Sequence, residues 1–150
     1  MIESTKMKIQ SYGKRIKEGK FKPMDNQTIK YITNQMMPFT TAKLRLSKIN
    51  SKTFDKLTYT DKNNLCRDLI KLTKKNLYTV KYFDSNPTNF IITKKNFIDN
   101  FNETLEKYGF EKFDILYVFV YINKETLRFN VYLKNAQKDS IFEAFDFKII

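Results

Sequence analysis

This 150-residue chain contains no histidine, no tryptophan and a single cysteine. Without histidine it lacks the commonest general base, the commonest metal ligand and any Ser–His or Cys–His nucleophile pair. The lone thiol, Cys66, can form no internal disulfide and cannot build a zinc site by itself. We therefore expect no catalytic residues, no metal and no cofactor, and a reducing, cytoplasmic location.

Glycine and proline are also scarce, with three residues of each. Because Gly13, Gly19 and Gly109 stand alone, neither the Walker loop nor the dinucleotide-binding glycine loop can be written on this sequence. No apolar run approaches the roughly 20 residues that a membrane helix needs. The polar, basic start lacks the apolar segment of a secretory signal. These absences predict a soluble protein with no membrane partner.

Positive charge is in excess, and it is unevenly distributed. The chain has 28 Lys and Arg residues against 16 Asp and Glu residues, a formal net charge of +12. Residues 1–24 and 25–75 carry this entire excess, whereas residues 76–150 hold ten residues of each sign. A basic half joined to a neutral half indicates a surface that binds a polyanion. A basic surface that only keeps the protein in solution is the alternative.

The order of the predicted elements indicates an α+β fold, in which a helical, basic half is followed by an antiparallel sheet with one packed helix. We expect residues 1–24 to form a basic arm and residues 25–150 to form one domain. Within that domain, residues 25–75 should be helical and basic, and residues 76–150 sheet-rich and neutral. With 14 Phe and 9 Tyr, the core should be aromatic.

Apolar residues at helical spacing predict the first elements of the basic half. The first helix covers residues 25–37, with Asp25 as its N-cap and a proline after its end. Residues 41–50 are predicted as a second helix, although the alternation around Leu44 and Leu46 would also suit a strand.

A short helix is expected at residues 51–57, and a longer one at 61–75 with Asp61 as its N-cap. One face of the longer helix is apolar and belongs to the core. Its other face is basic and is formed by Arg67, Lys71, Lys74 and Lys75.

Beyond this helix the apolar pattern changes to a period of two, which predicts strands. Residues 77–83 and 89–93 should pair as a hairpin, and Thr93 should cap a helix that Gly109 ends. Residues 113–122 are nearly all apolar, which is typical of a central strand covered on both faces.

The remaining strands are predicted at residues 127–134 and 145–149. In the former, one face should be buried and the face with Arg128 and Asn130 exposed to solvent. The side chains expected in the core include Leu69, Phe101, Phe119 and Phe129.

The succession of a short helix, a turn, a longer basic helix and a hairpin resembles the winged helix-turn-helix family. The resemblance implies that residues 54–57 lie in the first helix, residues 58–60 form the turn, and the longer helix enters the major groove of DNA. The residues implied at the groove are Lys62, Asn63, Asn64, Arg67 and Lys71, with Lys81 and Lys94 on the wing.

We expect the partner to be nucleic acid or a nucleoprotein, because lysine and arginine neutralise phosphates and neighbouring aromatic rings can stack on bases. The oligomeric state stays open. The candidate binding residues are the cations of the N-terminal half: Lys14, Arg15, Lys17, Lys20, Lys22, Lys43, Arg45, Lys62, Arg67, Lys71, Lys74 and Lys75.

Two other functions remain open. Small, basic proteins without catalytic motifs are similar in these respects to inhibitors from phages and mobile elements, such as anti-CRISPR and anti-restriction proteins, which occlude a nuclease. The triplet Asp146-Phe147-Lys148 has the D-x-K shape of magnesium-dependent nucleases, for which Asp114 or Asp139 would have to lie nearby. Solvated strand neighbours are the simpler interpretation of the triplet.

Two further features, an acidic cluster and the cysteine, have structural interpretations. The acids around Glu103, Glu106, Glu111 and Asp114 suit an exposed helix face, in which Glu103 and Lys107 form an i,i+4 pair. Cys66 falls in an apolar stripe, so we expect a buried, unreactive thiol.

Overall fold

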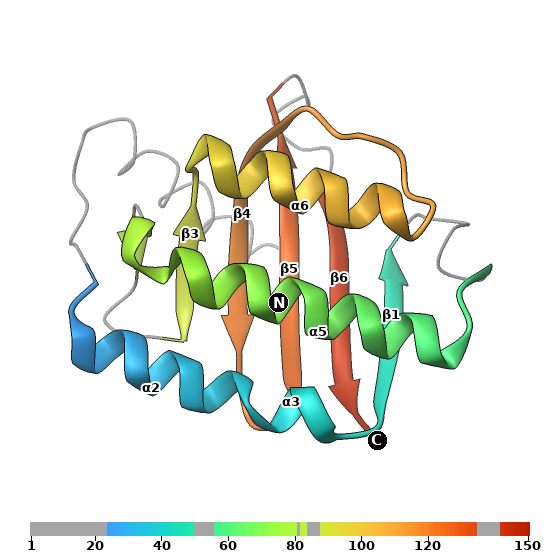
Figure 1. Ribbon diagram of the computed structural model, residues 1–150, viewed down its shortest axis with the longest axis horizontal. Helices are drawn as coiled ribbons and strands as arrows, with labels where there is room; N and C mark the ends of the chain where they lie inside the picture. The colour runs from blue at the N-terminus through green and yellow to red at the C-terminus, as the bar shows by residue number, and fades with distance from the viewer. Residues whose placement is uncertain (1–23, 50–55, 81, 84–87, 135–141) are drawn as a thin grey trace.

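A six-stranded antiparallel sheet organises the chain, and the described helices lie on one of its faces (Figure 1). The computed structural model describes residues 24–49, 56–80, 82–83, 88–134 and 142–150. The strands follow the order β1-β6-β5-β4-β3-β2 across the sheet. The expected α+β class is therefore confirmed.

The strands and helices have these bounds. The strands are β1 (Leu44–Ile49), β2 (Tyr82–Phe83), β3 (Asn89–Ile92), β4 (Ile115–Ile122), β5 (Thr126–Leu133) and β6 (Phe142–Ile149). The helices are α2 (Asn26–Met36), α3 (Pro38–Thr41), α5 (Tyr59–Asn76) and α6 (Lys95–Lys107), with a 3-10 turn, η1 (Leu77–Thr79).

Strand β1 corrects the helix predicted at residues 41–50. It pairs with β6 in antiparallel register, with Leu44 opposite Ile149 and Leu46 opposite Phe147. Leu44 and Leu46 are buried against the helices, whereas Arg45 between them is exposed. The period-two alternation therefore prevailed, because a partner strand 95 residues further along the chain supplied the hydrogen bonds of the sheet edge.

Helix boundaries follow local hydrogen bonds. Asp25 caps α2 as predicted, since its Oδ1 accepts from the Thr28 amide at 2.7 Å. The predicted cap of α5 was wrong: Thr58 is the N-cap, its Oγ1 accepts from the Asp61 amide at 3.1 Å, and the helix begins at Tyr59. Asp61 instead places an acid in the first turn, which the helix dipole favours.

The start of α6 also differs from the prediction, because its N-cap is Lys94, which makes no side-chain capping bond, and not Thr93. Its end is as predicted. Gly109 has φ of 91°, and the amides of Gly109 and Phe110 donate to the carbonyls of Glu106 and Leu105. Those two bonds make a Schellman motif, which needs a residue without a Cβ clash at this φ.

The winged-helix resemblance is not confirmed. β3 pairs with β4 along the sheet, with Ile91 opposite Phe119, so the hairpin belongs to the main sheet. Of the described residues 77–80 and 82–83 in the predicted strand, only Tyr82–Phe83 form a strand, and Leu77–Thr79 form η1. Asn63, implied at the DNA groove, is buried and donates to the Tyr59 carbonyl at 2.8 Å.

The main core lies between the sheet and the helices and is rich in phenylalanine. Phe101 of α6 has its ring centroid 6.1 Å from that of Phe129 on β5 and 6.3 Å from that of Phe145 on β6. These three side chains and Leu69 of α5 are fully buried. The predicted core positions Leu69, Phe101 and Phe129 are thus confirmed.

A second, smaller cluster lies on the other face of the sheet. It contains Ile91, Tyr117 and Phe119, with Tyr121 and Tyr132 packed against it. The rings of Tyr117 and Tyr132 stack with centroids 4.7 Å apart. Phe119 is buried as predicted, but in this cluster.

The face of β5 predicted to be exposed is partly covered, since Asn130 is only 2% exposed and Arg128 is half-buried. A period-two pattern separates the two faces of a strand but does not say how open the polar face is.

Within the described segments, no helix has both the length and the apolar character needed to cross a membrane.

Truncation of the main-core rings should be far costlier than loss of surface aromatics. We expect Phe101→Ala and Phe129→Ala each to lower the free energy of unfolding by about 3–5 kcal/mol, because each leaves a cavity. Tyr78→Ala, at a side chain 72% exposed, should change it by less than about 0.5 kcal/mol. Urea denaturation measures both, and a loss below about 1 kcal/mol for either phenylalanine would contradict its placement.

The stacked tyrosines predict a loss of stability in alkali. Burial raises the pKa of Tyr117 from 10.0 to about 12, and burial also raises the pKa of Tyr132. Above pH 10 the unfolded chain therefore releases phenolic protons that the folded chain retains. The contribution of these two tyrosines to the free energy of unfolding is thus fully present below pH 10 and is lost as the pH rises further. Denaturation at a series of alkaline pH values should show a shallower decline for Tyr117→Phe than for wild type. Tyr78→Phe, at an exposed ring, should decline as wild type does.

Candidate nucleic-acid interface

Helix α5 carries a basic stripe on the side turned away from the core. Leu65, Cys66, Leu69 and Ile70 are buried under the helix. The stripe is formed by Arg67, Lys71, Lys74 and Lys75, of which Lys74 is half-buried and the others exposed. The apolar residues fix the rotation of the helix, and the rotation presents the cations to solvent.

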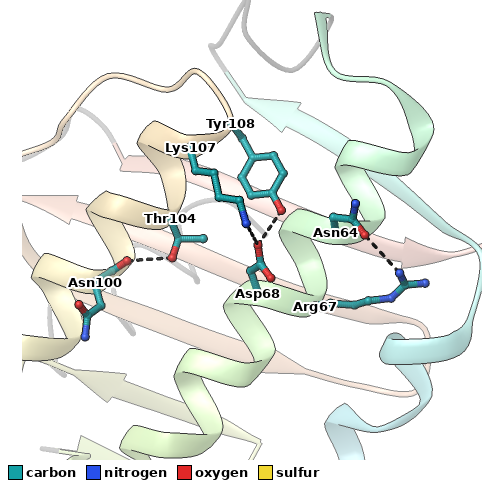
Figure 2. A network of polar contacts seen from close by, with 7 residues as sticks. All are labelled: Asn64, Arg67, Asp68, Asn100, Thr104, Lys107 and Tyr108. Carbon is teal, nitrogen blue, oxygen red and sulfur yellow. Dashed lines mark hydrogen bonds and ion pairs between the residues drawn. The ribbon is translucent and has the colours of Figure 1, made fainter.

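Arg67 also connects α5 to α3. Its Nε donates to the Thr40 carbonyl at 2.9 Å, and its Nη1 lies 3.3 Å from Asn64 Oδ1 (Figure 2). Two of its donor groups are thus used within the fold. Arg67 therefore anchors the start of the stripe, and the lysines beyond it are the more available cations.

The acid within this part of α5 is turned toward α6. Asp68 Oδ2 accepts from Tyr108 Oη at 2.6 Å and lies 3.4 Å from Lys107 Nζ (Figure 2). Burial, and secondarily the hydrogen bond to Asp68, raises the pKa of Tyr108, so the phenol remains a donor. This arrangement pairs Asp68 with Lys107 and Tyr108 on the α6 side of the helix.

Lys107 does not form the predicted i,i+4 pair with Glu103 in this arrangement. Its ammonium group lies beside Asp68, on the neighbouring helix. The sequence could not predict a pair between helices, because Asp68 and Lys107 are 39 positions apart and only packing brings them together.

An exposed aromatic ring extends the stripe. Tyr78 in η1 is 72% exposed and lies three residues after Lys75 along the chain. Exposed rings beside cations are the groups on which unpaired bases stack. The sequence carried this signal only as an aromatic residue after a basic run, and Tyr78 was not among the predicted binding residues.

The other candidate residues are placed elsewhere. Lys62 is half-buried near the start of α5, and Lys43 and Arg45 are exposed at β1, away from the stripe. Five candidates lie outside the described residues: Lys14, Arg15, Lys17, Lys20 and Lys22. Of the candidate residues that the structure describes, the four stripe cations share one side of a single helix.

The D-x-K triplet lies on β6. Asp146 is 8% exposed, and its Oδ2 is 3.2 Å from Nη2 of Arg128, the residue opposite it on β5. It is therefore a paired, buried acid and not the solvated neighbour of Lys148 that the sequence suggested.

Asp114, one of the two acids of which a nuclease would need one nearby, lies far from Asp146. The Asp114 carbonyl accepts from the amide of Lys134, six residues along β5 from the partner of Asp146, which is about 20 Å at roughly 3.4 Å per residue. Asp139 lies outside the described residues.

The acids of α6 line an open pocket of about 540 Å³ together with two lysines. Asp99, Glu103 and Glu106 alternate there with Lys95 and Lys112. Glu103 and Glu106 are exposed, as the helix-face interpretation predicted. Within the described ranges, no group of three or more His, Cys, Asp or Glu side chains could hold a metal ion.

Cys66 is fully buried in the core face of α5, as predicted. Burial strongly raises the pKa of its thiol, against a smaller opposite effect of the Arg67 charge. A thiol that stays protonated is a poor nucleophile.

Comparison of the chain with protein-family models, with curated proteins and with solved structures finds no match.

The contact between α5 and α6 can be tested by removing one hydroxyl. Tyr108→Phe should lower the free energy of unfolding by about 1 kcal/mol, because Asp68 loses a short hydrogen bond while keeping Lys107. Tyr78→Phe removes an exposed hydroxyl and should leave the free energy of unfolding unchanged. Equal stability of the two variants in urea denaturation would show that the Tyr108 bond does not stabilise the packing of the helices.

Proposed function

We propose that this protein is a non-catalytic nucleic-acid-binding protein, whose partner is a nucleic acid alone or within a nucleoprotein. The observation that carries the proposal is the basic stripe Arg67–Lys71–Lys74–Lys75 on the outer side of α5, with the exposed ring of Tyr78 beside it.

The length of the stripe suits a phosphate backbone. From Arg67 to Lys75 the helix rises about 12 Å, at 1.5 Å per residue. One strand of a duplex carries a phosphate about every 3.4 Å along its axis, so three to four phosphates lie within that distance. Four cations can therefore each approach a different phosphate or share neighbouring ones.

Local charge supports the same partner. Asp68 is compensated by Lys107, so its carboxylate does not cancel the potential of the nearby lysines. Such contacts position a backbone and do not read base sequence, because lysine ammonium groups at phosphates make no base-edge hydrogen bonds. Binding should accordingly tolerate many sequences.

The salt dependence of binding tests the proposal. The triple variant Lys71→Gln/Lys74→Gln/Lys75→Gln should weaken binding of every sequence by a similar factor. It should also reduce the slope of log K against log salt by about 2, since each lost phosphate contact removes roughly 0.7–0.9. Fluorescence anisotropy with single-stranded and duplex oligonucleotides at several salt concentrations measures both effects.

The matched control is Lys95→Gln/Lys112→Gln/Lys124→Gln. It removes the same charge, at exposed lysines of which the first two lie among the acids of α6, and should bind as wild type does. Equal weakening by both triple variants would mean that net charge alone governs binding. A wild-type protein that ignores free nucleic acid and binds a purified nuclease complex would contradict the proposal and favour an inhibitor.

A further inference from the structure

The face of the sheet opposite the helices brings two cations together without compensation. Arg45 of β1 and Lys148 of β6 are directly opposite each other in the antiparallel register. Like charges in opposite positions of a sheet are destabilising, with Cβ atoms only about 4.5–5.5 Å apart. Among the residues that the structure describes, neither has a carboxylate within 4.0 Å.

The adjacent pair on the same face is compensated. Two residues from Lys148 along β6, Asp146 lies opposite Arg128 of β5, and their charged groups are 3.2 Å apart. On this face of the sheet, Arg128 is therefore opposite an acid, whereas Arg45 is opposite a lysine. An uncompensated pair of this kind creates a local positive potential that attracts an external anion.

Arg128 is held as a third, oriented cation beside this pair. The guanidinium of Arg128 is paired with Asp146 Oδ2 and lies 5.7 Å from the centroid of the Tyr121 ring. The Arg128 side chain is 35% exposed. A planar, fixed guanidinium can donate to phosphate oxygens and stack on a base. The three cations come from β1, β5 and β6, so they converge only in the folded sheet.

We infer that Arg45 and Lys148, with Arg128 beside them, form a second anion site that binds a phosphate of a nucleic-acid strand. The site and its charge are independent of the α5 stripe, whereas the class of ligand rests on the proposed function. The helix layer and the sheet separate the two sites, since α5 covers the opposite face (Figure 1). One short strand cannot reach both, so one protein molecule binds two strands.

The experiment is a titration of the full chain with a single-stranded oligonucleotide of about eight nucleotides, a length within the roughly 4–16 that one small binding domain covers. Isothermal titration calorimetry at low salt should give two oligonucleotides per wild-type molecule. Arg45→Gln/Lys148→Gln should give one, and so should the α5 variant Lys71→Gln/Lys74→Gln/Lys75→Gln. The control Lys95→Gln/Lys112→Gln should give two.

The outcomes separate the two proposals. If the Arg45→Gln/Lys148→Gln variant still binds two oligonucleotides per molecule at wild-type affinity, the site on the sheet is refuted, whereas the proposal for the α5 stripe is unaffected. If the α5 variant binds as wild type does, while the sheet variant binds one oligonucleotide fewer, the binding role of the α5 stripe is refuted and the site on the sheet is supported. Saturation of the sheet site by inorganic phosphate, without preference for the oligonucleotide, would refute its assignment to a nucleic-acid strand.

Stability distinguishes a binding role from a structural one. Because Arg45 and Lys148 repel each other, Arg45→Gln should leave the melting midpoint unchanged or raise it while binding is lost. Arg45→Lys keeps the charge and should retain two strands. A lower melting midpoint for Arg45→Gln, together with lost binding, would make Arg45 a structural residue and contradict the inference.

Discussion

The insertion of β6 between β1 and β5 is the contact on which the rest of the structure depends. β6 pairs with both neighbours in continuous antiparallel register, and so joins the end of the chain to residues 44–49. Without β6, the strand that carries Leu44 and Leu46 would lose its hydrogen-bonded partner. The core would also lose Phe145 and Phe147. Because burial of large apolar side chains is the main favourable term in folding, this strand unites the basic and neutral parts into one core.

The same core determines where charge is presented. α5 packs its apolar face against the sheet, and the hydrogen bonds of Arg67 to α3 and of Asp68 to α6 hold the helix on both flanks. Its lysines therefore project from a rigid element. A rigid helix favours phosphate binding, because a flexible lysine-rich segment loses conformational entropy when it is ordered on binding. Lysines on a helix that is already folded avoid this loss of backbone entropy.

The two proposed anion sites share a physical logic. Each contains cations that have no carboxylate within 4.0 Å among the described residues, Lys71, Lys74 and Lys75 in one site and Arg45 and Lys148 in the other. Each also has a neighbouring acid that is paired with another cation, Asp68 with Lys107 and Asp146 with Arg128. Each also has an aromatic side chain nearby, Tyr78 or Tyr121. We propose that the protein thereby joins two nucleic-acid strands, one on each face.

Local pattern determined a large part of this molecule from the sequence alone. The α+β class, the helix at α2 with its Asp25 cap, the Gly109 terminus and the amphipathic α5 with its basic face all follow from interactions within a few residues. Those interactions are capping bonds, backbone conformations and apolar periodicity, and they act in the same way whatever the distant chain does.

Tertiary structure decided what depends on distant partners. The sequence favoured a helix over β1, with a strand as the alternative, and only the pairing with β6 decides for the strand. The hairpin resembled a wing, and only the pairing of β3 with β4 shows that it belongs to the main sheet. The division of charge between the two halves of the sequence does not foresee the site of Arg45, Lys148 and Arg128, because strand register sets two of them opposite each other across 103 residues of chain. Register is fixed by which faces are buried together, and that is a property of the whole sheet.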